Sequence, residues 1–399
     1  MGTTMPTSSG WHDHPMIAAA RSLAPAIAED ADQIEAGGRL TDAVAKDLTA
    51  AEIFQMYLPA SFGGPEVEPL TGFKVCEELA RVDASVGWCA QVSAAVTVFL
   101  AWLDPTALAE MVEISDGPLH VAGSARPLGR ATRVDGGFRV TGHWNYASGV
   151  RHANWFLATS LVDRPDGSEA ARSMLVPIAD GEIVGNWGVV GMRGTGSDDF
   201  VLDDVFVPEG RVGSNRWITE RRGSLYDPRL LMVATWAPTA GVGIGIAQGA
   251  LDALIELGEL GSTGSPLPLK TRAGVQQAVA EAETITGSAR AFAEESIGAA
   301  WQVLLDDGPD LDRAVARAQL AITNTLNEAV RVADICFHAA GTNAISTANR
   351  LERSLRDAHT AVQHAAGQSI HQRVAARTLL GLDPEPADPA RTGPTSPRT

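Results

Sequence analysis

The feature that most restricts the fold is the order of residue patterns along the chain, which runs from helices to short strands and back to long helices. From about Arg21 to Ser115, apolar residues recur every three or four positions, the spacing of amphipathic helices. Between about 118 and 226, short runs rich in β-branched and aromatic residues are bounded by Gly, Asp and Pro turns, which is typical of antiparallel strands. Few folds combine these patterns in this order.

The last region is helical again, with four segments rich in Ala, Leu, Glu and Arg at about 232–260, 272–305, 313–340 and 351–380. Helices of this length joined by short connections predict an up-and-down four-helix bundle. We therefore expect an α+β protein. Its expected parts are a disordered N-terminus at 1–15, an N-terminal helical domain at 16–117, an antiparallel β-domain at 118–226, a C-terminal helical bundle at 227–383 and a disordered tail at 384–399.

The composition disfavours several classes of partner. The 399-residue chain carries 48 acidic and 31 basic side chains, a formal net charge of −17, which repels both a nucleic-acid backbone and an anionic membrane surface. Its 3 cysteines form neither a metal-ligand spacing nor a disulfide framework, and the N-terminus lacks a signal-peptide pattern, so we expect a cytoplasmic protein. Two nearly uncharged spans, 82–103 and 230–251, contain polar residues, glycine or proline and favour buried helices over membrane spans.

Common nucleotide and metal motifs are missing from the sequence. There is no glycine-rich Rossmann turn, Walker A motif, G-x-S-x-G elbow or H-E-x-x-H pair. The glycine-rich run 241–249 lies inside a long apolar helical segment, which favours close helix packing. His359 and His364 stand five residues apart, about 140° around a helix, so they do not share a face that could hold a metal. We predict no metal site.

Four segments of the sequence resemble the acyl-CoA dehydrogenase fold. They are Gly-His-Trp-Asn-Tyr-Ala-Ser-Gly at 142–149, Trp-Gly-Val-Val-Gly-Met-Arg-Gly-Thr-Gly-Ser at 187–197, Asp-Asp-Val-Phe-Val-Pro at 203–208, and Arg-Asp-Ala-His-Thr-Ala-Val-Gln-His at 356–364. The residues in these segments are most similar to those of the two-component flavin-dependent monooxygenases of that fold. This branch includes 4-hydroxyphenylacetate, steroid-phenol, dibenzothiophene, indole and polyketide oxygenases, and the resemblance covers nearly the whole chain.

The resemblance implies a function as well as a fold. In this branch a separate NAD(P)H:flavin reductase supplies diffusible reduced FAD or FMN, whose C4a-hydroperoxide, formed with O2, oxygenates an electron-rich substrate. We therefore expect the oxygenase component of such a pair, acting on an aromatic or polycyclic small molecule. The resemblance also implies a homotetramer built through the C-terminal bundle, and it does not distinguish FAD from FMN.

Two residues are predicted to be catalytic from their places in the matched segments. Ser148 stands where dehydrogenases usually carry a threonine beside the flavin ring, and a hydroxyl can both donate and accept a hydrogen bond. His364 falls close to the place of the catalytic glutamate of many dehydrogenases, and no Glu occurs between Glu352 and Glu385. Because an imidazole titrates near neutrality, His364 is the candidate acid or base.

Further residues are expected to bind the flavin or the substrate. The flavin-binding candidates are Ser124, Ala147, Ser148, Arg193, Arg272, Gln276 and Gly341, the last in a loop that by resemblance meets a neighbouring subunit's flavin. The substrate-pocket candidates are Trp88, Gln91, Ser93 and Thr360, and spacing puts Thr360, His364 and His371 on one helix face. Phenol-hydroxylating relatives often carry a second histidine on the buried N-terminal helix. Its absence here favours an apolar, Trp-lined pocket for a polycycle, an indole or a polyketide.

Three alternatives stay open at this point. An acyl-CoA dehydrogenase or oxidase would take its carboxylate base from an earlier helix. An N-oxygenase of an amine or amino sugar would use the same flavin chemistry. A ligand-binding subunit would keep the fold and lack the chemistry. The missing glutamate and the Arg-Asp-x-x-Thr-x-x-x-His pattern favour the oxygenase.

Overall fold

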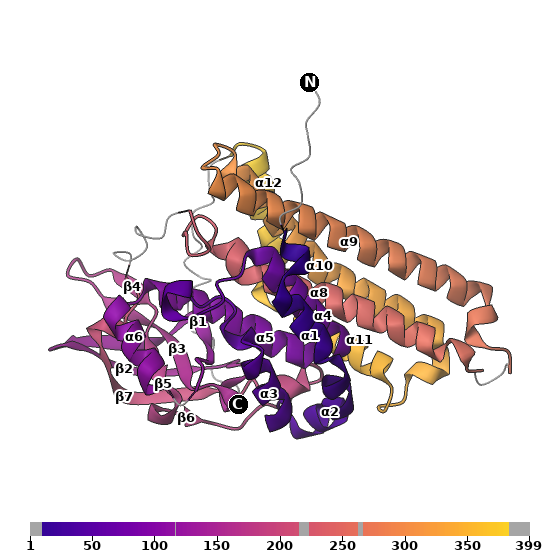
Figure 1. Ribbon diagram of the computed structural model, residues 1–399, viewed down its shortest axis with the longest axis horizontal. Coiled ribbons are helices and arrows are strands. Elements are labelled where there is room, and N and C mark those ends of the chain that lie inside the picture. Colours follow the sequence, from indigo (N-terminus) through magenta and orange to yellow (C-terminus); the bar gives the residue numbers. More distant parts are fainter. Residues whose placement is uncertain (1–9, 116, 215–222, 262–265, 383–399) are drawn as a thin grey trace.

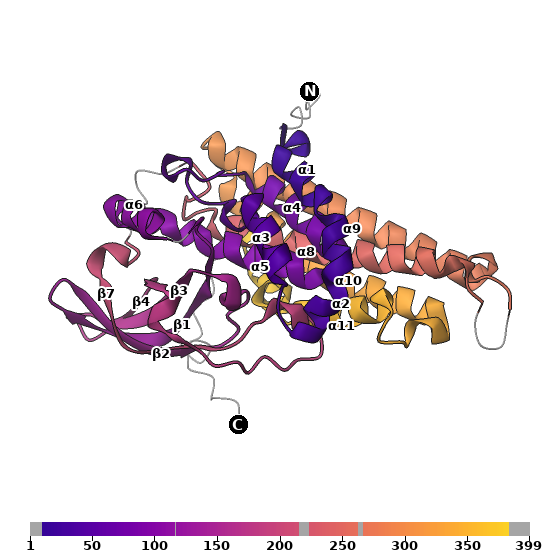
Figure 2. The same ribbon diagram turned by 60° about the horizontal axis from the view of Figure 1, so that its bottom comes forward.

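The computed structural model describes residues 10–115, 117–214, 223–261 and 266–382. The helical region, the sheet and the long helices follow one another in the expected order, with the sheet at one end of the molecule and the long helices extending to the other (Figures 1 and 2). The expected tail at 384–399 and residues 1–9 of the expected disordered N-terminus lie outside the described ranges. Within 1–15, residues 10–13 form a short 3-10 helix, Gly10–Asp13.

The N-terminal region places one apolar helix, α5, at the centre of the molecule. Its main helices are α1 (Pro15–Ser22), α2 (Ala24–Gly37), α3 (Asp42–Ala50), α4 (Pro69–Val82), α5 (Ala84–Thr97) and α6 (Pro105–Ile114). The side chain of Asp83 accepts a hydrogen bond of 3.1 Å from the Val86 N–H and so caps the start of α5. Because α5 packs against α4, α8 and β1, it is buried on nearly every side, which explains its lack of a polar face.

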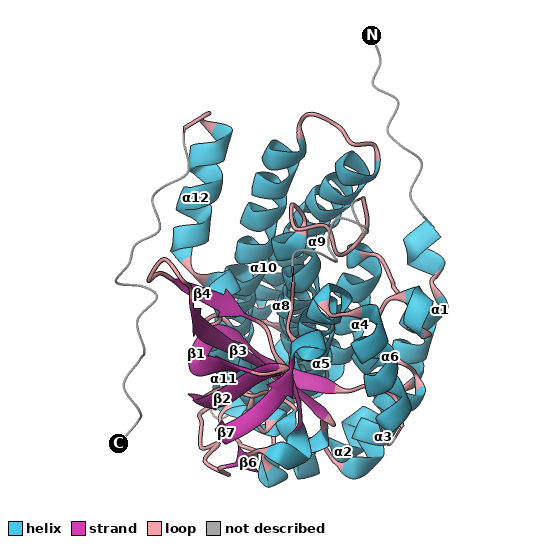
Figure 3. Ribbon diagram, turned by 90° about the vertical axis from the view of Figure 1, so that its left-hand side faces the viewer, coloured by secondary structure: helices cyan, strands magenta, loops and turns pink. Residues whose placement is uncertain are grey.

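The sheet is mixed, and in this respect the expected all-antiparallel arrangement is wrong. Its strands are β1 (Val121–Val134), β2 (Gly137–Trp144), β3 (Trp155–Asp163), β4 (Glu169–Arg172), β5 (Leu175–Pro177), β6 (Glu182–Ile183) and β7 (Phe200–Pro208). They lie in the order β4-β3-β1-β2-β7-β6, with β5 beside β3 (Figure 3). After β2, residues 145–154 cross to the other side of β1, so β3 runs parallel to β1. This crossing segment carries Ser148.

Three of the four expected long helices are continuous and the fourth is broken. α8 (Leu231–Glu256), α9 (Ala273–Leu305) and α10 (Leu311–Ala340) pack side by side, whereas 351–380 forms α11 (Arg350–Ala361) and α12 (Ser369–Leu379). The break has two local causes: His364 Nδ1 accepts a hydrogen bond from the Ala366 N–H, and the chain at Gly367 folds back onto the Val362 carbonyl, where a Cβ would stand 2.3 Å away.

This break corrects one expectation about the last helix. Thr360 belongs to α11, His371 belongs to α12, and His364 lies between them with non-helical backbone angles. The three residues therefore do not share a helix face. Helical spacing no longer applies across positions 362–368, because the backbone there is turned by local hydrogen bonds.

Two stretches are long and apolar enough to cross a membrane by length and composition, Ala84–Trp102 and Leu231–Glu259. In the fold, 78% and 72% of their most apolar windows are buried inside the protein. Their apolar character is thus accounted for by packing in the interior, as the polar residues within them led us to expect.

Candidate active site

The predicted residues Trp88, Ser148 and His364 come together at the junction of α5, the crossing segment and the end of α11. Trp88 Nε1 donates a hydrogen bond of 3.2 Å to Ser148 Oγ. The rings of Trp88 and His364 meet edge to face, with centroids 5.3 Å apart. Trp236 of α8 approaches His364 from another side, with centroids 6.2 Å apart. We call Trp88, Ser148, Trp236 and His364 the aromatic cluster.

The segment that carries Ser148 is held in place by a second loop. Tyr146 and Gly149 have φ values of 62° and 75°, so the backbone turns sharply on both sides of Ala147–Ser148. The Ala147 N–H donates to the Asp198 carbonyl at 3.1 Å, and the Gly149 N–H donates to the Thr195 carbonyl at 2.9 Å. The position of Ser148 therefore depends on loop 192–198 rather than on regular strand pairing.

The loop and Ser148 also share a chain of buried hydroxyls. Ser148 Oγ lies 2.7 Å from Ser197 Oγ, which lies 2.6 Å from Thr195 Oγ1. Thr195 Oγ1 donates at 2.8 Å to the Met192 carbonyl, and the Met192 N–H donates at 2.5 Å to Asp357 Oδ1 of α11. We call Ser148, Ser197 and Thr195 the hydroxyl chain. None of its members was connected to another by the sequence reasoning.

His364 is a neutral imidazole in this environment. Burial disfavours the charged ring and lowers its pKa to about 4, and His371 adds to the effect. Because Nδ1 accepts a hydrogen bond of 3.2 Å from the Ala366 N–H, the ring proton is on Nε2. At neutral pH the uncharged His364 ring can therefore donate a hydrogen bond from Nε2.

The helices α5 and α8 form the apolar side of the site. Trp88 and Gln91 are three residues apart on α5, and Trp236 and Thr239 are three residues apart on α8, so each pair lies on one side of its helix. Thr239 Oγ1 donates at 2.9 Å to Gln91 Oε1. Gln91 Nε2 is buried and has no hydrogen-bond partner among the described residues. It is a donor that a bound molecule could satisfy.

The sheet supplies the polar side of the site. β1 pairs with β3 up to Ser124 and resumes at Gly129, and the intervening residues 125–128 are partly or fully exposed. Ser124 Oγ accepts a hydrogen bond of 3.2 Å from the Arg126 N–H, and the Arg126 side chain donates at 3.1 Å to Asn145 Oδ1. Since Asn145 begins the crossing segment, Arg126 links the part of β1 that carries Ser124 to the segment that carries Ala147 and Ser148.

Two predicted pocket residues, Ser93 and Thr360, and the predicted flavin-binding residue Arg193 lie elsewhere. Ser93 Oγ donates at 2.7 Å to the Phe54 carbonyl, on another side of α5 from Gln91. Thr360 Oγ1 donates at 2.8 Å to the Arg356 carbonyl of its own helix and packs against Gly191. The Arg193 side chain lies 3.7 Å from the Glu35 carboxylate, away from Ser148. None of these contacts brings the three residues into the aromatic cluster.

The predicted flavin-binding residues of the bundle are far from the cluster in a single chain. Arg272 stands just before α9, Gln276 lies in its first turns, and Gly341 follows α10. Figure 1 shows this end of the bundle on the side opposite the sheet. The Asn343 side chain joins the connections that follow α8 and α10 by donating a hydrogen bond of 2.9 Å to the Gly261 carbonyl. We call Arg272, Gln276 and Gly341 the bundle-end group.

Sequence reasoning missed two aromatic residues of the site, Trp236 and His120. The His120 ring stacks on Phe54 with centroids 3.7 Å apart, and burial lowers its pKa to about 3. A Cβ on Gly149 would stand 3.7 Å from His120 Nε2, so this neutral ring lies beside the residue that follows Ser148. The spacing of Trp236 and Thr239 could have pointed to α8, whereas no local pattern marks His120.

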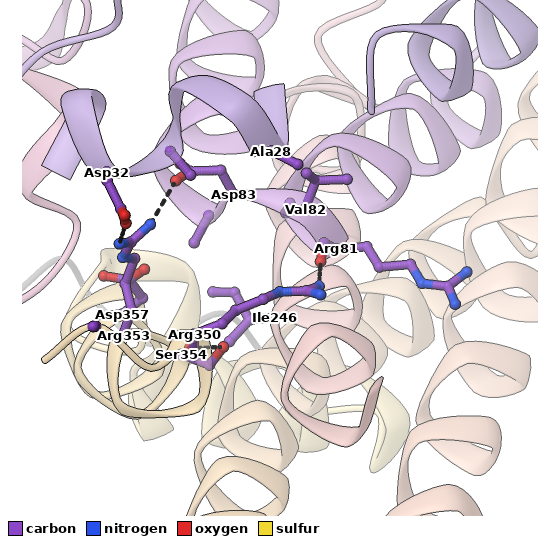
Figure 4. A pocket seen from close by; sticks show the side chains of 14 residues that line it. Ala28, Asp32, Arg81, Val82, Asp83, Ile246, Arg350, Arg353, Ser354 and Asp357 are labelled. Carbon is purple, nitrogen blue, oxygen red and sulfur yellow. Dashed lines mark hydrogen bonds and ion pairs between the residues drawn. The ribbon is translucent and has the colours of Figure 1, made fainter. Parts of the chain in front are cut away.

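A separate cavity of about 170 Å³ lies between α2, the start of α5, α8 and α11 (Figure 4). Arg353 crosses it and lies 2.5 Å from the Asp32 carboxylate and 3.9 Å from that of Asp83. Asp357 also lines this cavity, and burial raises the pKa of its carboxyl to about 7. No member of the aromatic cluster lines the cavity, so it is not the candidate active site. Within the described ranges, no group of three or more His, Cys, Asp and Glu side chains could hold a metal.

Comparison with known proteins shows the family to which the chain belongs. The chain matches the family models "Acyl-CoA dehydrogenase, N-terminal domain" over residues 14–103 and "Acyl-CoA dehydrogenase, C-terminal domain" over residues 237–369. It is 32% identical to an indole-3-acetate monooxygenase of Pseudomonas putida, over 84% of this chain and 85% of that protein. It is 30% identical to the flavin-dependent monooxygenase oxygenase subunit HsaA of Mycobacterium tuberculosis, over 88% and 91% of the two chains.

A solved structure extends the similarity to the whole architecture. The crystal structure of 3-HSA hydroxylase from Rhodococcus sp. RHA1 superposes with a TM-score of 0.83 at 26% identity, covering 94% of this chain and 99% of that one. The fold and the family expected from the sequence are confirmed. The chain belongs to the flavin-dependent monooxygenases that have the acyl-CoA dehydrogenase fold.

Proposed function

We propose that the protein is the oxygenase component of a two-component system that uses reduced flavin and O2 to hydroxylate an aromatic or polycyclic small molecule. The observation that carries this proposal is the aromatic cluster, in which Trp88 contacts both the Ser148 hydroxyl and the neutral His364 ring. Within the described part of the chain, no polar contact of Trp88, Ser148 or His364 goes to a carboxylate. This favours oxygenation over a dehydrogenase, which needs a carboxylate base.

The residues present fit a flavin ring. A flat ring with polar edges matches the interruption of β1 at 125–128, where the strand is exposed and Ser124 and Ser148 lie on adjacent segments. When bound, the flavin supplies the activation of O2. Ser148 would contact the ring edge, and Ser124 and the backbone at Ala147 would position the ring. The Arg193 side chain is paired with Glu35, which argues against its expected part in flavin binding.

The cluster itself suits an apolar aromatic substrate. Trp88 and Trp236 are partly exposed although many neighbours on their helices are buried, and His364 is partly exposed at the turn after α11, so a planar molecule could contact these rings. Gln91 Nε2 would orient the substrate by donating a hydrogen bond, since it has no partner among the described residues. The Nε2–H of His364 would donate a hydrogen bond near the oxygen that is transferred. The Trp side chains would exclude water from it.

The oligomer, the partner and the location complete the proposal. A single chain keeps the bundle-end group away from Ser148, so that group can meet a flavin only if another subunit supplies it. We therefore propose a homotetramer that places each bundle end against a neighbour's flavin. A separate NAD(P)H:flavin reductase would deliver reduced FAD or FMN, and the proposed location is the cytoplasm.

The decisive experiment supplies chemically reduced FMN or FAD, isotopically labelled O2 and a panel of indoles, phenols and fused-ring aromatics. We expect one product that carries a single labelled oxygen atom, measured by mass spectrometry, only when protein and reduced flavin are both present. An acyl-CoA that bleaches bound oxidised flavin, with no labelled product from any aromatic compound, would show that the protein is a dehydrogenase instead. A labelled amine product would identify an N-oxygenase.

A further inference from the structure

The hydroxyl chain has a direction that the structure determines. A backbone carbonyl can only accept, so Thr195 Oγ1 uses its single hydrogen on the Met192 carbonyl, 2.8 Å away. In the contact of 2.6 Å with Ser197, Thr195 must then accept, and Ser197 must donate. The hydrogen of Ser197 is thereby used, so Ser148 is the donor in the contact of 2.7 Å between Ser148 and Ser197.

This order leaves Ser148 with only one kind of hydrogen bond to offer. Its hydrogen points to Ser197, and one of its two lone pairs accepts from Trp88 Nε1 at 3.2 Å. What remains is a single lone pair, an acceptor. The three hydroxyls are buried, with exposed fractions of 5%, 3% and 2% for Ser148, Ser197 and Thr195, so water does not readily reorient them.

The acceptor character matters because a flavin changes at N5 when it is reduced. Reduced flavin carries a hydrogen on N5 and can donate to Ser148, whereas oxidised flavin presents a lone pair there. Two facing acceptors repel, and a buried mismatch of this kind disfavours binding. We propose that Thr195 and Ser197 are positioning residues that hold Ser148 Oγ as an acceptor and so make the site selective for reduced flavin. This inference rests on the proposed function, because it assumes that Ser148 faces the flavin edge.

The far end of the hydroxyl chain is anchored rather than loose. The Met192 N–H donates at 2.5 Å to Asp357 Oδ1, and Met192 has a φ of 56°, a conformation uncommon for a residue with a side chain. The Asp357 contact holds this turn, whose carbonyl receives the Thr195 hydrogen. The direction of the Ser148 hydroxyl is therefore set from α11, through a loop, at a distance from the ring it would contact.

The test measures the affinity of the whole protein for FMN and FAD, each in oxidised and dithionite-reduced form, under anaerobic conditions. The variants are Thr195→Val and Ser197→Ala, which free the Ser148 hydrogen, and Thr195→Ser, which keeps the donor. The matched control is Thr325→Val. Thr325 is equally buried and donates at 2.8 Å to the carbonyl of Ile322, three residues before it, as Thr195 does to Met192, but it lies inside α10.

We expect the wild type and Thr325→Val to prefer reduced flavin, with Thr195→Ser close to them. Thr195→Val and Ser197→Ala should lower the ratio of the two affinities about tenfold, the effect of one mismatched buried hydrogen bond. A tenfold change in this ratio corresponds to about 30 mV in the potential of the bound two-electron couple, which gives a second readout. Thermal unfolding identifies variants that have lost the fold, and if Thr195→Val is one of them, Ser197→Ala decides.

The binding measurements distinguish a failure of the positioning role from a failure of the proposed function. If the wild type prefers reduced flavin and the folded Thr195→Val and Ser197→Ala variants keep that preference, the positioning role is overturned while the proposed function stands. A wild type that binds both redox forms equally also overturns it. A wild type that binds neither form overturns the positioning role and the proposed function together.

Discussion

Ser148 and His364 of the aromatic cluster were predicted from the same resemblance as the bundle-end group, yet the two regions differ in how complete they are in one chain. The cluster is assembled from the α5, α8, crossing and post-α11 segments, and its polar groups are mostly satisfied within the chain. The bundle-end group lies at connections on the outside of the molecule, where Arg272 and Gln276 donate to the carbonyls of Leu267 and Lys270. The bundle-end group therefore cannot contact a flavin that is bound beside Ser148 of the same chain.

This difference indicates which functions one folded chain can supply and which need a neighbouring subunit. Proton handling needs a buried, neutral and fixed environment, which one core can supply. Binding of an anionic cofactor by a chain with a net charge of −17 needs a few placed donors, which an assembly can bring from a neighbour. The following predictions test whether the two regions are as separate in function as they are in space.

The largest effect is expected from His364→Ala. Removing the Nε2–H donor should lower product formation at least about a hundredfold, the usual scale for the loss of one preorganised hydrogen-bond donor. Flavin affinity should stay within a few-fold, because Trp88 and Ser148 remain. Coupled assays of labelled product against flavin consumed measure the first quantity, and equilibrium titration measures the second. The control is His359→Ala, an exposed residue of α11 that pairs with Asp334. Equal effects of the two variants would contradict a catalytic role for His364.

The next effect concerns the substrate and not the flavin. Gln91→Leu removes the buried Nε2 donor, which has no partner among the described residues. We expect KM for the aromatic substrate to rise about tenfold, the scale of one lost hydrogen bond, with flavin affinity unchanged. Steady-state kinetics over a range of substrate concentrations checks this. A variant that keeps its KM but loses thermal stability would show that Gln91 serves only as the hydrogen-bond acceptor of the Thr239 hydroxyl.

Arg272→Ala tests the bundle end directly. It should weaken flavin binding about threefold to tenfold, with kcat at saturating reduced flavin unchanged, because the residue is distant from the cluster in its own chain. Sedimentation measurements must show the same oligomer as the wild type. A loss of flavin affinity in a monomeric form would contradict the proposed contribution from a neighbouring subunit.

The smallest effect is a difference in pH dependence. The pKa of Asp357 is raised to about 7, above its usual range, mainly by burial. Between about pH 4 and pH 7 the folded state therefore binds more protons than the unfolded state, so this carboxyl makes stability fall as pH rises. Asp357→Asn keeps an oxygen acceptor for the Met192 N–H and should flatten that fall, a change of a few degrees in Tm at pH 7 relative to pH 5. The control is Asp334→Asn, whose native side chain is 44% exposed, and an unchanged slope in Asp357→Asn would contradict the expectation.

Much of the fold could be predicted because its signals are local. The period of the apolar residues indicated the helices, and the turns at Gly136 and Gly167 bounded the strands. The break after α11 could not be predicted in this way, since it depends on a hydrogen bond from the Ala366 N–H to His364 and on close packing at Gly367. The parallel pairing of β1 and β3 likewise depends on where the crossing segment runs.

The site was predictable to the extent that it lies in contiguous motifs. Ser148 and His364 were found because each belongs to a recognisable segment, and Trp88 because it lies on a buried helix. Ser93 was grouped with the pocket as a polar residue of the buried helix, and Thr360 by its helical spacing from His364. Their hydroxyls instead donate to nearby carbonyls. Trp236 was missed because it adds only one aromatic residue to an apolar helix, and contacts between distant segments leave no periodic trace.

The crossing segment between β2 and β3 has a consequence for how the protein reaches its working state. Ser148 is positioned only when Trp88 and the loop at 195–197 have reached it, His364 must pack against Trp88, and β3 must pair in parallel with β1. Contacts so distant in sequence form late and slowly, because the entropy of closing long loops must be overcome first. Chains that end before His364, whether still emerging from the ribosome or cut by a protease, therefore lack a complete aromatic cluster and should be inactive. Activity should return during refolding only with the last and slowest kinetic phase.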